Sequence, residues 1–499
     1  MLKTVSYFME DKIHAFIFLL SIFNIFLNNF FFKQSIRFHK KQFQYLFDQE
    51  KTSFRCLENG WPERGSREFW PYYFYPNFPS LHDIFEDNGY LKAVLSTHLI
   101  ETHSNFKPRM KLLHTSTWAL YFHENNETKN RNFTVNKHGI LTKPTFDPEI
   151  QVIKLIFKIP PEYQNKYNFA TIQRVLDDND IDNISYRPID ENEPLYNPKY
   201  YEGGQEMQGG IQRTKIFMKM PENQDNINDL SYRNVPFCQI KDKYSIYVNP
   251  IPENRTDNFL ISENGQPKDY LRICTQNRIF DSKEKNEIIF RWVLYNLEQG
   301  FSKPIIYINK IDENESLAMP HFANLIKKDM VEMIYFVFPY AFFFHEQFSQ
   351  EISCLERNKG RAVWLGHDDV DERFFNTGTN ETILEYLKRF SVRNDITGIG
   401  GIKTPNEWME RMDDDTTFTD TGNREYFAKA KNIIVADNVE VYYVHLIKNG
   451  KRTIRQDDIV NAHFKDIKTG VVKFKNKILS PRMTEINQRL TKKIHELIA

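Results

Sequence analysis

Four acidic side chains that follow an apolar run are the residues best suited to chemistry. Residues 362–365, with sequence AVWL, predict a buried strand, and the acids come directly after it: Asp368, Asp369, Asp371 and Glu372. In open α/β sheets, ligands bind at the carboxyl ends of the strands. Asp369 and Asp371 flank one residue, so in an extended conformation their carboxylates point to one side and can share a hard divalent cation that bridges diphosphate oxygens. A solvated acidic turn is the alternative for so short a motif.

The pattern around these acids predicts elements that place them at a sheet edge. From residue 270, strand-like and helix-like segments alternate: strands at 270–276, 304–309, 331–338 and 362–365, and helices at 285–297, 318–328 and 346–359. This alternation is typical of an α/β fold with a mostly parallel, doubly wound sheet. Residues 483–498 predict an amphipathic closing helix.

The part of the chain before residue 250 has a different pattern of residue types. Runs rich in β-branched and aromatic residues at 90–99, 111–122, 150–159 and 214–220 are separated by polar, turn-rich stretches, which predicts a β-rich region. The glycine-rich segment 201–212 is expected to be a solvated loop. Breaker residues at 250–269 are typical of a domain junction. We therefore predict a β-rich accessory domain at 68–265 and the sheet domain at 266–499.

Composition limits the function classes. The chain has 499 residues, 40% of them hydrophobic, with 66 Lys and Arg against 66 Asp and Glu. This content excludes a wholly disordered chain. A net charge of zero provides no overall field for a polyanion, so no nucleic-acid partner is expected.

One segment is long and apolar enough for a bilayer. Residues 13–32 span about 30 Å as a helix, and no small-residue cleavage site follows them, which favours a transmembrane signal-anchor over a cleaved signal peptide. Residues 1–12 would form a cytosolic tail and 33–67 a stem. Basic residues after the segment favour a cytosolic C-terminus, whereas six N-x-[ST] sequons favour a lumenal one; they lie at Asn126, Asn132, Asn183, Asn254, Asn314 and Asn380. Chance occurrence in an Asn-rich chain is the alternative.

The four cysteines are too few and too dispersed for a disulfide scaffold or a zinc site. Cys56 and Cys238 lie in polar loops and are the better candidates for a pair. Cys274 and Cys354 lie in apolar stretches and are expected to be buried thiols.

The segment from about residue 273 to 467 resembles nematode-type members of glycosyltransferase family 92, formerly a domain of unknown function. The resemblance consists of short motifs in a consistent order: Ile273-Cys274-Thr275, Trp292 and Tyr295, Ile306-Tyr307-Ile308-Asn309, Gln350 with Cys354 and Arg357, Trp364, Asp369-Val370-Asp371-Glu372, Asp420-Thr421-Gly422, the strand before His445, and Asn461-Ala462-His463-Phe464-Lys465.

The resemblance implies a glycosyltransferase A-type (Rossmann-like) fold, a sugar-nucleotide donor, Mn²⁺ or Mg²⁺, and inversion at the anomeric carbon. Relatives use UDP-galactose. It implies Asp369, Asp371 and His463 as metal ligands, and it suggests four positions for donor contacts: Thr275, Asn309, Arg357 and Asp369. A surface histidine is the alternative for His463. His445, at a strand end, is expected to be structural.

Such a transfer also requires a base that takes a proton from the acceptor hydroxyl. Acids in one segment are the candidates: Glu410, Asp413, Asp414, Asp415 and Asp420, with Glu410, Asp415 and Asp420 assigned to catalysis without a choice among them. A solvated acidic loop is the alternative for each. Trp292 and Tyr295, one helical turn apart, are expected to be packing residues.

The prediction is therefore a type II single-pass membrane glycosyltransferase of the Golgi or endoplasmic reticulum lumen. It would transfer a sugar, galactose first among the possibilities, from a UDP-sugar to a glycan acceptor. An inactive glycan-binding protein is the alternative, motivated by Ile308, where many relatives carry an acid, and by the displaced Asn286-Glu287. A metal-dependent phosphodiesterase would require more clustered His and Asp.

Overall fold

A computed structural model describes part of the chain. The described residues are 56, 80–96, 116–123, 135–136, 138–147, 152–175, 201–208, 211–218, 231–240, 269–277, 283–308, 324–325, 328–335, 343–420, 424–425, 430–443, 445–448, 450–464 and 476–498. The expected tail and signal-anchor lie outside them, and residue 56 is the one described residue of the expected stem. Within the described residues no helix has the length and apolar character needed to cross a membrane.

A seven-stranded sheet organises the second half of the chain. Its strand order is β14 (Glu332–Tyr335), β13 (Ile305–Ile308), β12 (Asp269–Asn277), β15 (Ala362–His367), β20 (Lys431–Val435), β17 (Ile399–Thr404) and β23 (Arg452–Arg455). The first four strands are parallel, whereas β20 is antiparallel to both of its neighbours. The predicted α/β class with a mostly parallel sheet is confirmed, and the A-type fold stays a prediction.

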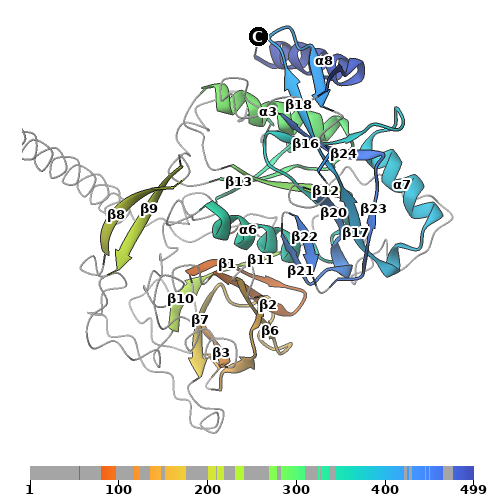
Figure 1. Cartoon of the computed structure of the whole chain (residues 1–499). Helices are drawn as coiled ribbons and strands as arrows, with labels where there is room; N and C mark the ends of the chain where they lie inside the picture. Colours follow the sequence, from red (N-terminus) through yellow and green to blue (C-terminus); the bar gives the residue numbers. More distant parts are fainter. Residues whose placement is uncertain are drawn as a thin grey trace, which may run out of the picture. The chain divides into compact units, whose positions relative to one another are not determined.

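Two helices cover opposite faces of this sheet. Leu271 and Ile273 of β12 pack with α3 (Lys283–Glu298), whereas Cys274, the residue after Ile273, packs with α6 (Phe343–Asn358). This alternation follows from the two-residue period of a strand. Figure 1 shows α3 and α6 on either side of β12 and β13. The predicted helices at 285–297 and 346–359 are thereby confirmed.

A second, mixed sheet was not foreseen from the sequence. Its order is β16 (Glu372–Asn376), β24 (Ile459–Phe464), β18 (Asn406–Arg411), β19 (Thr417–Asp420) and β25 (Lys477–Leu479). The remaining elements of this half of the chain include the helices α7 (Ile383–Arg393) and α8 (Pro481–Ile498) and the short hairpin β21 (Val441–Tyr443) and β22 (Leu446–Lys448). Only a short turn separates β15 from β16, so it joins the two sheets.

The β-rich region is built from two further sheets. One has the order β11 (Cys238–Gln239), β1 (Ser80–Asp87), β2 (Tyr90–Ser96), β6 (Val152–Lys158) and β5 (Thr145–Asp147). The other has the order β10 (Ser231–Pro236), β7 (Phe169–Val175), β3 (Thr117–His123) and β4 (Ile140–Thr142). One cluster of buried side chains, which includes Ile84, Trp118 and Phe157, draws on both sheets. The β-rich character is as predicted.

The prediction that residues 201–212 form a solvated loop was wrong. This segment contains the strand β8 (Tyr201–Gln208), which pairs in antiparallel register with β9 (Ile211–Met218). Gln208 pairs with Ile211, so only Gly209 and Gly210 connect the two strands. Gly-Gly is a favoured sequence between two paired strands, so the sequence itself is compatible with the observed pairing.

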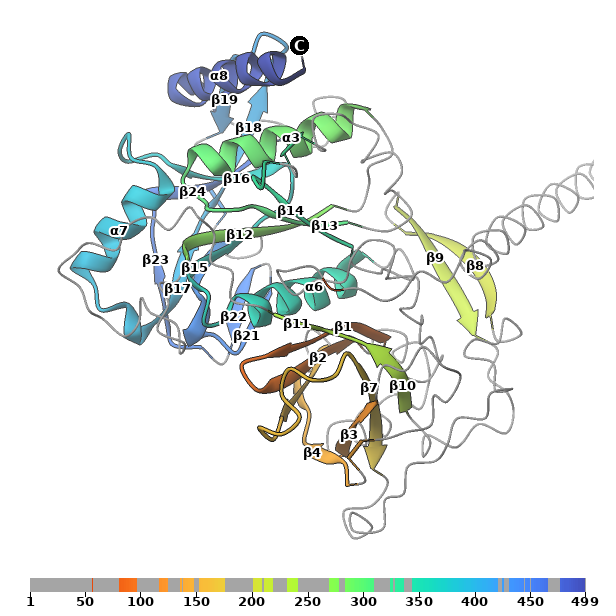
Figure 2. The same cartoon turned by 180° about the vertical axis from the view of Figure 1, so that it is seen from behind.

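Buried ion pairs join the β-rich region to α6. Arg357 contacts both carboxylate oxygens of Asp83, with Nε at 2.8 Å from Oδ2 and Nη2 at 2.7 Å from Oδ1. The Lys154 ammonium lies 3.0 Å from Glu356 Oε1. Figure 2 shows α6 beside β1 and β2. The β-rich region therefore packs against α6. The domain boundary near residue 266 stays a prediction.

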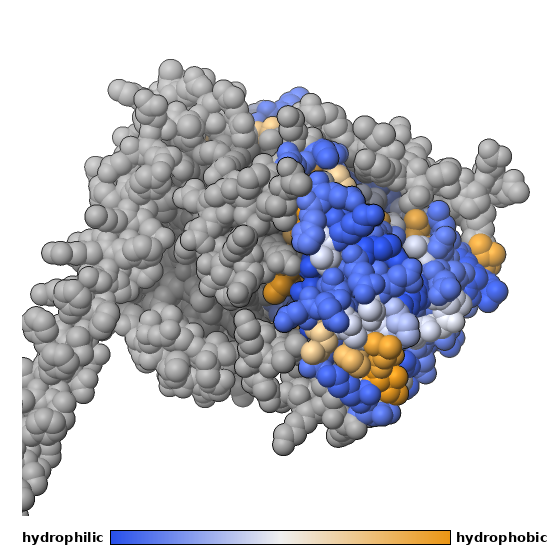
Figure 3. Space-filling view, turned by 90° about the horizontal axis from the view of Figure 1, so that it is seen from above, coloured by the Kyte–Doolittle hydropathy of each residue, from blue (hydrophilic) through white to orange (hydrophobic). Residues whose placement is uncertain are grey.

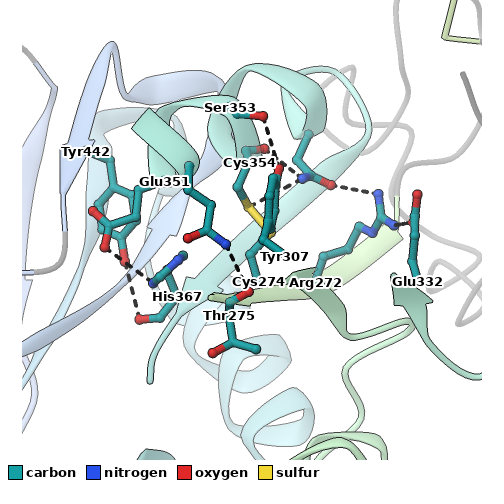
Figure 4. The surroundings of a disulfide bond; sticks show 12 residues. Arg272, Cys274, Thr275, Tyr307, Glu332, Glu351, Ser353, Cys354, His367 and Tyr442 are labelled. Carbon is teal, nitrogen blue, oxygen red and sulfur yellow. Dashed lines mark hydrogen bonds and ion pairs between the residues drawn. A yellow bond between two sulfur atoms is a disulfide. The ribbon is translucent and has the colours of Figure 1, made fainter. Parts of the chain in front are cut away.

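Both pairs of cysteines form disulfides. Cys56 is bonded to Cys238, which confirms the predicted pair. Cys274 is bonded to Cys354, so the expectation of two buried thiols was wrong. Figure 4 shows this second disulfide between β12 and α6. The bond forms because α6 packs on the face of β12 from which Cys274 projects.

The surface seen in Figure 3 is mainly hydrophilic, with separate hydrophobic patches among the coloured residues. Large hydrophobic side chains that remain exposed among the described residues include Val392, at 65%, and Leu479, at 49%. Most large apolar side chains of the described chain are buried in the clusters named above.

Candidate functional site

The acidic motif forms the turn between β15 and β16. All six residues of β15 are buried, and the Glu372 amide donates a hydrogen bond to the Asp369 carbonyl oxygen at 2.9 Å. The expectation that residues 369–371 are extended was therefore wrong, because the chain reverses here to enter the second sheet. The side chains of Asp369 and Asp371 are 39% and 46% exposed. Both carboxylates are accessible to solvent.

Lys431, the first residue of β20, provides the positive charge of the site. Its ammonium lies 3.0 Å from Asp369 Oδ2 and 2.7 Å from Glu372 Oε2. The Lys431 side chain is 1% exposed and that of Glu372 is 3% exposed. Because β20 pairs with β15, the sheet brings this lysine to the turn. It forms a buried ion-pair bridge between the turn and β16.

His463 of β24 lies on the other side of Glu372. Its Nε2 is 3.3 Å from Asp371 Oδ2, and its Nδ1 is 3.2 Å from Glu372 Oε1. The register of the second sheet places it there, since His463 pairs with Glu372 on one side and with Trp408 on the other. The Trp408 and His463 rings pack at 4.2 Å between centroids. The structure thus brings the predicted residues Asp369, Asp371 and His463 together near the Glu372 carboxylate.

Buried hydrogen bonds fix the start of the turn. Asp368 is fully buried and accepts a hydrogen bond from Trp292 Nε1 at 2.8 Å. The Thr275 hydroxyl donates to the Asp368 carbonyl oxygen at 2.8 Å. From α6, Gln347 Nε2 donates to Asp369 Oδ1 at 3.3 Å. Trp292 and Tyr295 are both fully buried, which confirms them as packing residues.

The electrostatics follow from burial and from Lys431. Burial would raise the pKa of Asp369, but the Lys431 ammonium outweighs it and lowers that pKa to about 2. Burial raises the pKa of Glu372 despite the same ammonium. Burial lowers the pKa of Lys431, but Asp369 and Glu372 outweigh it and raise that pKa above its ordinary value. At neutral pH, Asp369 and Lys431 are therefore both charged.

Two further histidines lie near the site, His367, which is buried, and His445, which is half-buried. Burial lowers the pKa of His367, the last residue of β15, to about 3, and Figure 4 shows this ring beside Glu351 and Tyr442. His445 Nδ1 lies 3.0 Å from the Ala430 carbonyl oxygen, and burial lowers the pKa of His445 to about 4. These contacts agree with the structural role expected for His445.

The residues predicted to contact the sugar-nucleotide donor do not all lie near the acidic turn. Thr275 adjoins the acidic turn and is fully buried, whereas Asn309 lies outside the described residues. Arg357 is ten residues after Gln347 on α6, about 15 Å along the helix axis, and it is ion-paired with Asp83. This position gives no support to a donor contact by Arg357.

The predicted bases lie on the β18–β19 hairpin or in its turn. Glu410 is ion-paired with Lys477 at 2.5 Å. Asp415 is buried and accepts hydrogen bonds from Arg411 Nη1 at 2.9 Å and from the Thr491 hydroxyl at 2.5 Å. Asp420 is buried and accepts a hydrogen bond from the Asn476 amide at 3.0 Å. These contacts link the hairpin to its neighbours, and the choice of a base stays a prediction.

Lys431, Gln347 and Trp408 are the site residues that sequence reasoning missed. Lys431 stands two residues before the apolar run Ile433-Ile434-Val435, so its position at a strand start was the available signal. No local pattern marks Gln347 or Trp408. The position of Gln347 depends on the packing of α6, and that of Trp408 depends on the pairing of β18 with β24.

The donor types at the turn suit a hard divalent cation, which prefers carboxylate oxygens. Asp369 and Asp371 are two such carboxylates within reach of solvent, and His463 lies beside Asp371. Among the described side chains, no three His, Cys, Asp or Glu groups are arranged to hold a metal ion. The chemical types of these side chains are therefore compatible with a cation, and a cation site at this turn stays a prediction.

The sequence model described as glycosyltransferase family 92 matches residues 269–498. Residues 269–498 are therefore a glycosyltransferase family 92 domain. The match begins at the first residue of β12 and ends at the last residue of α8. It therefore includes both sheets and the acidic turn between them. No curated protein is similar enough to match the chain. At the general level that the family supports, this family 92 protein is a glycosyltransferase.

Proposed function

We propose that this family 92 domain is a metal-dependent, inverting glycosyltransferase with an A-type fold. It would transfer a sugar, galactose first among the candidates, from a UDP-sugar to a glycan acceptor. The observation that carries the proposal is the pair of solvent-accessible carboxylates, Asp369 and Asp371, directly after the buried strand β15. This is the end of an open sheet at which ligands bind. The donor and the stereochemistry rest on the family resemblance alone.

The charge of the turn explains why a cation is needed. Asp369, Asp371 and Glu372 supply three carboxyl groups, and Lys431 supplies one buried ammonium. A diphosphate that approaches the exposed carboxylates would meet like charges. Asp369 and Asp371, with His463 beside them, would hold Mn²⁺ or Mg²⁺. When bound, the cation neutralises the diphosphate leaving group.

The remaining steps use the chain's own residues. Lys431 holds Asp369 against β16, and Gln347 contacts the same carboxylate from α6, so the turn keeps one conformation as a donor binds. The acceptor hydroxyl must lose its proton to a base as the new bond forms. Glu410, Asp415 and Asp420 are the carboxylates proposed for this step.

We also propose that the domain lies in the lumen of the Golgi or the endoplasmic reticulum, held by a single helix at residues 13–32. All four cysteines are in disulfides. Disulfides of this kind persist in oxidising compartments and are rare in the cytosol. This pairing supports a lumenal chain and opposes the cytosolic C-terminus that the basic residues favour.

Hydrolysis of donor sugars tests the enzymatic proposal. The chain from about Lys41 onward is incubated with a panel of UDP-sugars, with Mn²⁺ or with chelator. We expect release of UDP from one donor that chelator abolishes. The doubly substituted Asp369→Asn, Asp371→Asn protein should lose this activity. If no UDP-sugar is consumed and UDP does not bind in Mn²⁺, the enzymatic proposal is wrong, and the inactive glycan-binding alternative is favoured.

A further inference from the structure

The loop between β16 and α7 displays a sequon that the proposed reaction does not use. Asn380, Glu381 and Thr382 form an N-x-T sequence. Residues 377–380 are all exposed. The other five sequons lie outside the described residues, so Asn380 is the sequon whose surroundings can be examined.

Hydrogen bonds hold the backbone of this loop in place. Arg482 of α8 donates to the carbonyl oxygens of Asn376 at 2.5 Å and of Glu381 at 3.1 Å, and also to that of Thr379. The Asn376 side-chain oxygen accepts hydrogen bonds from the Gly378 and Thr379 amides, both at 3.0 Å. The loop is therefore anchored by Arg482 of α8 and by Asn376, the last residue of β16.

The Asn380 amide takes no part in these bonds within the described residues. Its sequon partner Thr382 is the N-cap of α7, and the Thr382 hydroxyl accepts from the Glu385 amide at 3.2 Å. Glu381 is engaged with Arg389. Hydrogen bonds and an ion pair thus hold Glu381 and Thr382 in place, whereas the Asn380 side chain is exposed at the surface.

The position of Asn380 separates it from the candidate active site. β16 begins at Glu372, beside Lys431 and His463, and ends at Asn376. Four residue steps along a strand cover about 13 Å. A large group on Asn380 would therefore extend from the far end of β16 and leave the acidic turn accessible.

We propose that Asn380 is an N-glycosylation site. The Asn380 side-chain nitrogen would form a bond to the anomeric carbon of an oligosaccharide carried on a lipid diphosphate. The bond from that carbon to the diphosphate oxygen breaks, the lipid diphosphate leaves with its electron pair, and the amide loses one proton to a base. Asn in N-x-[ST] on a surface loop is the acceptor that this modification requires. The inference rests on the proposed lumenal location and is independent of the proposed sugar transfer.

Site-specific mass spectrometry of the full-length chain from a secretory eukaryotic cell tests the proposal. Enzymatic release of the glycan converts a modified Asn to Asp, so occupancy is read on the peptide that contains residue 380. We expect a glycan there in the wild-type chain and in Thr382→Ser, which keeps both the sequon and the capping hydroxyl. Asn380→Gln, which leaves the N-cap intact, should lose one glycan and the corresponding shift on a gel.

An unmodified peptide at residue 380 overturns the proposal. If other sequons are glycosylated in that sample, the chain is lumenal and only the Asn380 assignment fails; if none is, the lumenal location fails with it. Release of UDP by Asn380→Gln, measured in parallel, shows separately whether the proposed enzymatic function holds.

Discussion

The Lys431 ammonium lies 3.0 Å from Asp369 Oδ2, and this contact joins the antiparallel strand β20 to the turn that follows β15. The same ammonium is 2.7 Å from Glu372 Oε2. One buried lysine thus offsets two carboxylates that stand three residues apart in the turn. The candidate site depends on it, because Asp369 and Glu372 would otherwise repel each other.

Substitution of Lys431 should destabilise the protein strongly. In Lys431→Met the Glu372 carboxylate stays buried without its partner, and removal of one member of a buried ion pair costs about 3–5 kcal/mol. Urea unfolding of the chain measures this loss. Lys492→Met is the matched control, because Lys492 is exposed on α8, and its effect should stay within about 0.5 kcal/mol.

A second substitution separates charge from packing. If the loss arises from the uncompensated carboxylate, Lys431→Met combined with Glu372→Gln should recover part of the stability. Equal losses in the single and double variants would contradict the ion-pair account of the turn.

The ion pair between Asp83 and Arg357 predicts that the β-rich region is needed for a stable sheet domain. Both side chains are 4% exposed. Asp83→Asn leaves the Arg357 guanidinium buried without its counter-charge, which we expect to cost about 3–5 kcal/mol of unfolding free energy.

An exposed ion pair provides the comparison for Asp83. Arg455 and Asp457 have side chains that are 54% and 56% exposed, so Asp457→Asn should cost less than about 1 kcal/mol. Thermal unfolding followed by circular dichroism compares both variants with the wild-type chain. Similar small losses from Asp83→Asn and Asp457→Asn would show that the contact between β1 and α6 contributes little.

Glu86 of β1 should make stability depend on pH. Burial raises the pKa of Glu86 from 4.5 to about 7, although hydrogen bonds from Asn165 and Gln239 oppose this. Because the folded state holds this proton more tightly than the unfolded state, the contribution of Glu86 to stability is fully present below about pH 4.5 and is lost as the pH rises to about 7. The total change is about 3 kcal/mol.

Replacement by glutamine should remove that dependence. Glu86→Gln is expected to gain stability over the wild-type chain at pH 8 and to match it near pH 4.5, as measured by urea unfolding at each pH. Glu485→Gln, at a side chain that is 72% exposed on α8, should show the same difference from wild type at both pH values. A pH-independent difference for Glu86→Gln would contradict the assigned pKa.

The sequence predicted those parts of the fold that depend on local pattern. Alternation of apolar runs and amphipathic segments located β12, α3, β13, α6 and β15. The hydrophobic residues recur every 2 residues in a strand and every 3.6 residues in a helix, so these elements can be recognised from the local sequence. The second sheet was not foreseen, since its strand β24 pairs with β16, which lies more than 80 residues earlier in the sequence. The Cys274–Cys354 disulfide was missed for a similar reason, as it depends on α6 covering β12.

The candidate site shows the same division. Asp369 and Asp371 were found because they directly follow a buried strand, and that position is a local feature. Their extended conformation was wrong because the chain must reverse to enter β16, and Lys431 was missed because only the pairing of β20 with β15 brings it to the turn. The resemblance to a family, rather than any spacing, placed His463 in the same set.

Binding of UDP, measured by calorimetric titration in the presence of Mn²⁺, tests the central claim most directly. We compare the wild-type chain with Asp371→Asn, whose exposed side chain should permit folding, and with Asp457→Asn as a control for the loss of one surface carboxylate. The account predicts that UDP binds the wild-type and Asp457→Asn proteins in Mn²⁺, and at least about tenfold more weakly, or 1.4 kcal/mol, when Mn²⁺ is chelated or Asp371 is replaced. Equal affinity in all four cases, or no UDP binding by the wild-type chain, would contradict it.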